Sequence, residues 1–465
     1  MPGTETPGTS DSCCDEKISN PSLETIENDK LFVNRFACLF NNERLSDIIV
    51  NVGDDRFFAH KFILIVCSEV FEVMLNEERW KESSQPEITL TEVEECIPVF
   101  FHFLRYMYTG SVGLTTDNVL PILLLADKYC MPALSNTCVE YMTCHIVQSP
   151  DTNRTLSWYQ YAKMTGNSIL VDKCRKFILS NFDIILKTSD WTELLRTEVV
   201  EFLMSSDLVV SNEYDLWLQV KKWLLHDKNV GELEENIEEV IPLLRFKMIP
   251  PKQLLEIEKS ELHSTDEYGG IFKQKLNEAY RHHSLLMNQV NVERDGNKYR
   301  NYTSPIYGLC IDMSLLHYHY VEKFESKICK QVSIPIEYVA SSDDSREVKF
   351  EVIFWPKGPF KTFNWYGHTS ENATMSVRML SREYTSVEVT LALILYGIKN
   401  GIKYVAFTYN NKHTFNSQTT MFTEENVVSL KKLTAKNSPC LVNGNIEAKL
   451  FIKIENIEGE SRNDQ

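Results

Sequence analysis

Two short histidine segments are the first candidates for chemistry in this sequence. His317 and His319 flank Tyr318, and on a strand this spacing places both imidazoles on one face, where they could bind a metal ion. No third ligand follows at an informative spacing, so an accidental pattern is the alternative. His60 stands beside Lys61, but a histidine without a positioned nucleophile does not make a catalytic site. The sequence therefore predicts no metal, no cofactor and no catalytic residue.

The short motifs of common enzyme classes are also absent. The chain has no GxxxxGK[ST] phosphate loop, no GxGxxG after a strand, no GxSxG elbow and no HExxH. We therefore expect a protein that is not an enzyme. Three asparagines, Asn153, Asn301 and Asn372, begin N-glycosylation sequons, which we expect to be unused in an intracellular chain.

Composition narrows the class of partner and the compartment. The 465 residues include 48 Lys and Arg against 65 Asp and Glu, a net charge of −17, which disfavours nucleic acid and anionic membranes as partners. The 12 cysteines are scattered without a CxxC pair, as in buried thiols of a reducing compartment. The N-terminus has neither the basic nor the apolar segment of a signal peptide. We expect a cytoplasmic protein, with a secreted, disulfide-bonded chain as the alternative.

Residue periodicity divides the chain into parts. Residues 1–28 are rich in Ser, Thr, Pro and Glu, which predicts a disordered tail. Short strands and a majority of helices follow up to residue 146, and residues 147–285 are almost purely helical. After residue 298 the period changes to two, which is typical of strands.

The part with period two predicts an antiparallel sandwich with one buried face per sheet. Val387, Val389 and Leu391 begin a run of apolar residues that alternates with Glu388 and its successors. Turn signals such as Asn400-Gly401 separate the runs.

Several motifs before residue 146 resemble those of a BTB/POZ domain. They keep their spacing along the chain: Leu45–Val50, Phe58–Leu64, Cys67-Ser68 with Phe71, Ile88–Leu90, Phe103–Gly110, Leu124–Tyr129 and Leu134. Residues 147–285 resemble the BACK domain, with Trp223-Leu224 and Leu243–Phe246 in the expected places. The order is similar to that of BTB–BACK proteins with a C-terminal TRAF-like domain.

This resemblance implies a multidomain α+β protein. We expect an α/β BTB domain over residues 29–146, an all-α BACK domain over 147–285 and a linker over 286–297. An antiparallel β-sandwich, TRAF-like, would cover 298–458, and 459–465 would be a tail. A secreted branch of this family begins with a signal peptide, which this sequence lacks.

The resemblance also implies where cullin-3 would dock. Trp80-Lys81-Glu82 stands where many BTB domains have a hydrophobic residue, any residue and a glutamate. A large aromatic can fill a partner's pocket while the carboxylate bonds at its edge. Phe71 and Met74 lie nearby and are candidate contributors, with a place in the core as the alternative that we favour. The alternative is that Trp80 covers its own core and Glu82 is solvated.

Two further sets of residues have roles implied by the family. Leu31, Phe32 and Phe36 resemble the BTB dimerisation helix, with packing inside one chain as the alternative. Asp47 and His60 resemble the structural pair at the entry to a BTB helix, which is the role we predict for them.

The aromatic cluster of the last domain leaves two interpretations open. It either lines a peptide-binding face or fills the sandwich core and its connecting loop; its members are Phe354, Trp355, Phe360, Phe363, Trp365 and Tyr366.

Together these features predict a non-catalytic homodimeric adaptor that recruits an unidentified protein substrate to a cullin-3 ubiquitin ligase. The substrate would bind the C-terminal domain. The alternative is a self-associating scaffold, like the secreted relatives, that binds partners without cullin-3. A transcriptional co-regulator would need a basic or zinc-finger segment, which this chain lacks.

Overall fold

The computed structural model describes residues 28–76, 80–264, 269–287, 299–323, 325–338, 346–359, 371–435 and 437–460. The predicted tail up to residue 27 and most of the predicted linker lie outside these residues, as do residues 461–465. The chain divides into two compact units, of which the first comprises residues 1–114 and 121–135 and the second residues 115–120 and 136–465.

A three-stranded sheet with helices around it forms the first unit. The strand order is β2-β1-β3, with β1 and β2 antiparallel and β1 and β3 parallel. Its elements are α1 (Asp29–Ala37), β1 (Ile48–Val52), β2 (Asp55–Ala59), α2 (Lys61–Cys67), α3 (Glu69–Asn76), β3 (Glu87–Leu90), α4 (Phe100–Thr109), and α5 (Val119–Lys128) and α6 (Pro132–Cys144), which continue into the second unit. Alternate residues of β1 are buried, as expected for a sheet covered on one face.

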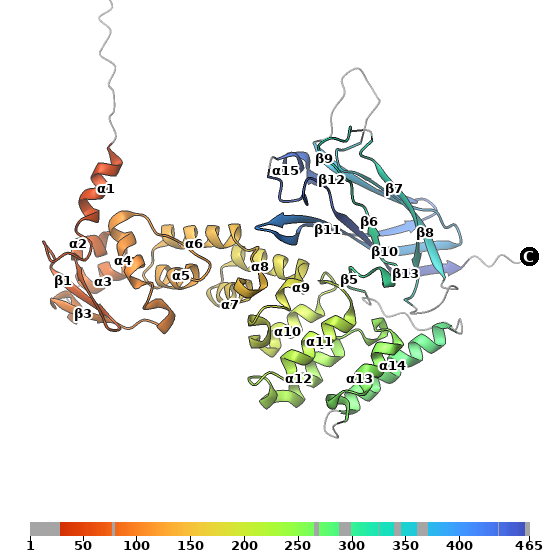
Figure 1. The fold of residues 1–465 in the computed structure, drawn as a ribbon, viewed down its shortest axis with the longest axis horizontal. Helices are drawn as coiled ribbons and strands as arrows, with labels where there is room; N and C mark the ends of the chain where they lie inside the picture. The colour runs from red at the N-terminus through yellow and green to blue at the C-terminus, as the bar shows by residue number, and fades with distance from the viewer. Residues whose placement is uncertain are drawn as a thin grey trace, which may run out of the picture. The chain divides into compact units, whose positions relative to one another are not determined.

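The helical part of the second unit follows the predicted period of 3.6. Its helices, yellow to green in Figure 1, are α7 (Thr155–Thr165), α8 (Ser168–Ser180), α9 (Phe182–Ile185), α10 (Arg196–Met204), α11 (Glu213–Leu224), α12 (Leu233–Val240), α13 (Pro251–Glu258) and α14 (Gly269–Met287). The predicted apolar face of α11 is buried, with Trp217 and Trp223 almost fully enclosed. Pro251 is the first residue of α13, where its missing N–H costs nothing.

Two four-stranded antiparallel sheets form the C-terminal part, which confirms the predicted sandwich. The first sheet has the order β11-β10-β13-β6 and the second β12-β9-β8-β7. The strands are β6 (Cys310–Asp312), β7 (Ile328–Pro335), β8 (Glu347–Trp355), β9 (Asn372–Met379), β10 (Tyr384–Lys399), β11 (Ile402–Asn416), β12 (Met421–Ser429) and β13 (Ala448–Glu460); α15 (Leu430–Thr434) follows β12. The predicted turn at Asn400-Gly401 joins β10 to β11, with φ values of 53° and 78°, as a two-residue hairpin turn requires.

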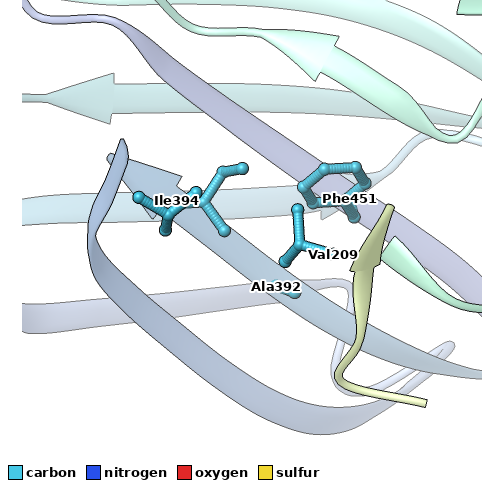
Figure 2. Packing of buried hydrophobic residues seen from close by; sticks show 5 residues of the cluster. Val209, Ala392, Ile394 and Phe451 are labelled. Atoms are coloured by element: carbon cyan, nitrogen blue, oxygen red, sulfur yellow. The ribbon is translucent and has the colours of Figure 1, made fainter. Parts of the chain in front are cut away.

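The prediction of one buried face per sheet is wrong for the first sheet. Leu391 and Leu393 of β10 face the second sheet, yet Ala392 and Ile394 between them are each only 1% exposed. Val209 of the helical part packs on this other face, against Ala392, Ile394, Val405 and Phe451 (Figure 2). The face is apolar because the helical part covers it.

A short parallel ladder crosses from the helical part to the sandwich. β4 (Val209–Val210) pairs with β5 (Asn301–Tyr302), the first described strand after α14. β4 therefore places Val209 over the sheet while β5 leads the chain into the sandwich.

Candidate protein-interaction sites

His60 is buried and hydrogen-bonded within the first unit, as its predicted structural role requires. Its backbone N–H donates to Tyr108 Oη at 3.1 Å, and its ring nitrogens lie 3.0 Å from Tyr108 Oη and from the Arg44 carbonyl oxygen. Asp47 Oδ1 accepts from the Lys61 N–H at 2.8 Å, which caps the first turn of α2. Burial raises the pKa of Tyr108 to about 12, against the opposing effect of the bond from the His60 backbone, so this phenol remains a neutral partner.

Trp80 and Glu82 lie at the surface of the first unit. Trp80 is 46% exposed, and it precedes a 3-10 turn, Lys81–Ser83, that contains the half-buried Glu82. An indole with this exposure keeps a large apolar surface in water, which contact with a partner would remove.

The two residues predicted to assist Trp80 differ in their burial. Phe71 is fully buried and stacks on Tyr129 with ring centroids 4.7 Å apart. Its ring belongs to the core of the unit, as the alternative to a docking role expects. Met74 is half-buried and remains a candidate contact.

Helix α1 presents an apolar face to solvent. Leu31 and Phe32 are 62% and 60% exposed, and Phe36 is half-buried, with its ring centroid 5.1 Å from that of Phe32. Two large apolar side chains exposed on one helical turn are typical of a surface that a partner covers.

Helix α2 carries a second apolar surface that sequence reasoning missed. Phe62 and Val66, one helical turn apart, are 67% and 70% exposed. Both α1 and α2 contact α4, so the two surfaces share a supporting helix. The signal was present in the sequence, because neighbouring Ile63 and Leu64 complete the buried face of α2 and leave Phe62 and Val66 without a place in it.

A buried ionic network joins the helical part to the sandwich in the second unit. Glu213, the first residue of α11, and Arg300, next to β5, are fully buried, and Arg300 Nε lies 3.2 Å from Glu213 Oε2. The Arg300 guanidinium also donates to the carbonyl oxygens of Leu203, Ser205 and Leu243 at 2.7, 2.7 and 3.0 Å. Each nitrogen of this buried guanidinium therefore donates to an acceptor, as the burial of a cation requires.

The Glu213 carboxylate is equally well bonded. Tyr302 Oη donates to its Oε2 at 2.6 Å, and the Arg245 backbone N–H donates to its Oε1 at 2.8 Å. Burial acts to raise the pKa of Glu213, but the charges of Arg300 and Arg245 and the bond from Tyr302 outweigh it and hold that pKa below its ordinary value. The network remains ionised at neutral pH and fixes α11 to the segment that begins the sandwich.

Asn181 makes a second connection between the two parts. Its Oδ1 accepts from the Val405 N–H at 2.6 Å, and its Nδ2 donates to the Val405 carbonyl oxygen at 3.3 Å. One side-chain amide thus satisfies both main-chain groups of a residue on the edge strand β11, as a neighbouring strand would.

The two histidines considered as metal ligands do not lie on a strand. His317 and His319 lie in a turn, with φ of 50° at His317, so the predicted strand is wrong there. No group of three or more His, Cys, Asp and Glu side chains suited to a metal occurs among the described residues. Among the same residues, no helix is long and apolar enough to cross a bilayer.

The three sequon asparagines differ in exposure, and only part of the aromatic cluster lies among the described residues. Asn153 and Asn301 are each 2% exposed, and Asn372 is half-buried. Phe354 is fully buried in the sandwich, whereas Phe360, Phe363, Trp365 and Tyr366 lie outside the described residues.

Three family models match successive parts of this chain: the BTB/POZ domain over residues 36–146, BTB And C-terminal Kelch (BACK) over 155–259, and the BTBD17 TRAF domain over 297–458. The chain therefore contains a BTB/POZ domain, a BACK domain and a C-terminal TRAF-like domain, and the predicted order is confirmed. Such domains are typical of protein-interaction adaptors without catalytic activity.

Among individual proteins, the chain resembles BTB/POZ domain-containing protein 17. It is 29% identical to the Xenopus tropicalis protein over 62% of this chain and 61% of that one, and 27% identical to the human protein over 61% and 59%. Rat galectin-3-binding protein is 27% identical over 57% of this chain and 46% of that one. These matches span about three fifths or less of the relatives' length.

A solved structure of the human gigaxonin BTB domain is similar to part of the chain. The match covers 26% of this chain and 99% of that one, at 19% identity and a TM-score of 0.22.

Proposed function

We propose that this chain is a homodimeric adaptor that brings a protein substrate to a cullin-3 ubiquitin ligase in the cytoplasm. In this proposal the BTB domain dimerises through α1 and docks cullin-3 through Trp80 and Glu82. The helical part carries the sandwich, and the sandwich selects the substrate. The adaptor performs no chemistry itself and acts by bringing two reactants together.

The observation that carries this proposal is the exposure of Trp80 beside Glu82 on a BTB domain. Tryptophan is a frequent anchor of protein interfaces, and a carboxylate two positions further along the chain can supply a directional bond at the edge of a pocket. At 46% exposure the indole is partly held by its own domain and keeps an exposed apolar surface.

The junction between the helical part and the sandwich is a second support. An adaptor must hold its substrate domain at a defined distance and angle from its ligase. Three contacts hold the sandwich on the helical part: the Glu213–Arg300 ion pair, the Asn181 amide and the packing of Val209 on the sheet.

Calorimetric titration of the full chain with the N-terminal domain of cullin-3 tests the proposal. The double variant Trp80→Ala/Glu82→Ala is expected to bind at least about 30-fold more weakly, the loss of one interface hot spot. The matched control is Val93→Ala/Glu94→Ala, which removes an exposed apolar residue and its adjacent carboxylate from the same unit. Gel filtration and circular dichroism check that each variant keeps its fold.

Tight wild-type binding that only the first variant loses would support cullin-3 docking at Trp80. Absence of binding by the wild-type chain would overturn the proposal. Equal weakening by both variants would place the contact elsewhere.

The second candidate is a self-associating scaffold that binds partners without cullin-3. The exposed apolar faces of α1 and α2 favour self-association in either case, and the resemblance to galectin-3-binding protein favours this candidate. A secreted form of this fold would carry glycan on Asn372, because Asn153 and Asn301 are buried. Mass spectrometry of the chain from cultured cells, which detects glycan on Asn372, decides between the scaffold and the cullin-3 adaptor.

A further inference from the structure

A cavity of about 210 Å³ lies in the helical part of the second unit, between α9 and α11. The segment at and after α9 lines one side, and α11 lines the other; the main lining residues are Asp183, Leu186, Lys187, Asp215, Leu218 and Gln219. The described residues around the cavity all precede the sandwich in sequence. The cavity is therefore a feature of the helical part alone.

Asp183 places a half-buried carboxylate in this cavity. Its Oδ2 accepts from Ser211 Oγ at 2.7 Å, and its Oδ1 accepts from the Ser211 N–H at 3.3 Å. Among the described residues, no lysine, arginine or histidine forms an ion pair with it. A carboxylate whose donors are one hydroxyl and one amide retains acceptor capacity for a cation.

A second carboxylate, that of Asp215, lines the same cavity. Its Oδ2 accepts from the neutral Asn212 amide at 2.7 Å. Burial raises the pKa of Asp183, and the negative charge of Asp215 acts in the same direction, whereas the bonds from Ser211 and the positive charge of Lys187 oppose the effect. The lining therefore carries two negative charges and one positive charge, and a further cation would relieve the repulsion between the carboxylates.

Two leucines give the cavity apolar walls. Leu186 is 4% exposed, so its side chain is held in the core of the helical part. Leu218 is 41% exposed, although it lies on the same helix as the buried Trp217 and Trp223. A leucine left in water beside a half-buried carboxylate suits a ligand that combines positive charge with apolar surface.

These features favour a guanidinium group over other cations. An ammonium ion is strongly hydrated, so contact with leucine side chains costs it more free energy. A guanidinium is planar and weakly hydrated, and its fork of N–H donors matches a carboxylate. Calcium and magnesium ions take about six oxygen ligands, and leucine side chains provide none.

The size of the cavity indicates a single side chain as its occupant. Sites for whole small molecules enclose about 300–1,000 Å³, which is more than the volume of about 210 Å³ found here. The domains of this chain are typical of protein-interaction adaptors, so a protein surface is the source of that side chain.

From this geometry we infer that the cavity is a binding site for an arginine side chain of a protein partner. The guanidinium pairs with Asp183 and packs on Leu186 and Leu218, while Asp215 adds a second negative charge and Lys187 competes with the ligand. The inference goes beyond the proposed function, because it gives the helical part a partner site of its own. It stands whether or not cullin-3 binds at Trp80.

The test uses the full chain and three short peptides, acetyl-Gly-Ser-Xaa-Ser-Gly-amide, in which Xaa is arginine, lysine or citrulline. Citrulline has the shape of arginine without its charge. Saturation-transfer-difference NMR measures the dissociation constants. The arginine peptide is expected to bind with a dissociation constant on the order of 1 mM, and the other two at least about ten-fold more weakly.

Two substitutions in the cavity change the affinity in opposite directions. Asp183→Asn keeps an oxygen for the bond from Ser211 but removes the charge, so the arginine peptide should bind about ten-fold more weakly. Lys187→Gln removes the competing cation and should strengthen binding about three-fold. The matched controls Asp227→Asn and Lys173→Gln make the same changes of charge at exposed positions outside the lining, and they should bind as the wild type does.

Weaker binding in Asp183→Asn together with tighter binding in Lys187→Gln, both absent from the controls, supports the inference. Equal binding of the arginine and citrulline peptides by the wild-type chain overturns it, as does an equal loss in Asp183→Asn and Asp227→Asn. A lysine peptide that binds as tightly as the arginine peptide overturns the assignment to a guanidinium. Thermal unfolding followed by circular dichroism checks that every variant keeps the fold.

Discussion

At the scale of single residues, Lys453 shows how the junction changes an ionisable group. It lies on β13 with 1% of its surface exposed, and its Nζ donates to the Ser206 carbonyl oxygen at 3.3 Å. Burial lowers its pKa to about 8, although Asp207 and Glu455 oppose this effect. The helical part supplies Ser206 and Asp207, so the cost of burying this charge arises from the junction.

Replacement Lys453→Met should stabilise the chain at pH 7. The folded chain binds fewer protons than the unfolded chain between pH 8 and 10.5, so wild-type stability rises with pH in this window. The advantage of the variant should be on the order of 2–3 kcal/mol at pH 7 and nearly vanish by pH 10.5. Urea denaturation across this pH range measures both values. A difference that stays constant with pH would contradict the prediction.

At the scale of elements, α1 is the clearest candidate for self-association. Its exposed Leu31 and Phe32 present apolar surface that packing among the described residues leaves uncovered. A two-fold interface would place this face against the same face of the second chain. The dimer would then bury both copies of each side chain. The adjacent Phe36 would support Phe32 in that arrangement.

The double variant Leu31→Asp/Phe32→Asp should convert the proposed dimer to a monomer. Two charges in an apolar interface are expected to raise the dissociation constant roughly 100-fold or more. Sedimentation velocity at several concentrations measures the change. Leu195→Asp, on an equally exposed leucine of the helical part, should leave the dimer intact. A wild-type chain that is monomeric at all concentrations would remove α1 as a dimerisation helix.

Sequence patterns predict helices and strands well where the period of the apolar residues reflects a single buried face. The alternation in β10 and the apolar face of α11 correspond to buried faces, and the Asn400-Gly401 turn joins the expected strands. The cover on the first sheet is different. Ala392 and Ile394 are apolar at positions where a strand with one buried face would carry polar residues. The neighbouring sequence does not indicate that Val209, more than 180 positions earlier, packs on them.

The candidate sites show the same limit. Asp47 and His60 follow from a resemblance in local sequence, and each makes a hydrogen bond near the start of α2. Trp80 and Phe71 belong to one predicted docking set, yet they differ in burial: Phe71 stacks on Tyr129 in the core, whereas Trp80 is 46% exposed. Partners distant in sequence, such as Glu213 and Arg300, left no local signal.

At the scale of the whole molecule, the helical part and the sandwich depend on each other. Domain models divide them at residues 259 and 297, whereas contacts place both in one compact unit. A carboxylate, an amide and a valine from the helical part each meet a partner from the later segment. The helical part therefore holds the sandwich in place. Residues of both the helical part and the sandwich fix the orientation of the sandwich.

The sandwich should therefore be poorly stable when produced alone. Residues 298–460 without the helical part would expose Ala392, Ile394 and Phe451 as a contiguous apolar face and leave the Arg300 charge unpaired. At about 25 cal/mol per Å² of exposed apolar surface, plus the unpaired ion, the loss would be several kcal/mol, comparable with the stability of a domain. Comparison of this fragment with the full chain by urea denaturation and light scattering measures the dependence. In the fragment, Ile394→Lys should reduce aggregation, whereas in the full chain it should destabilise the junction. A fragment as stable and monodisperse as the full chain would show that the sandwich is an independent domain.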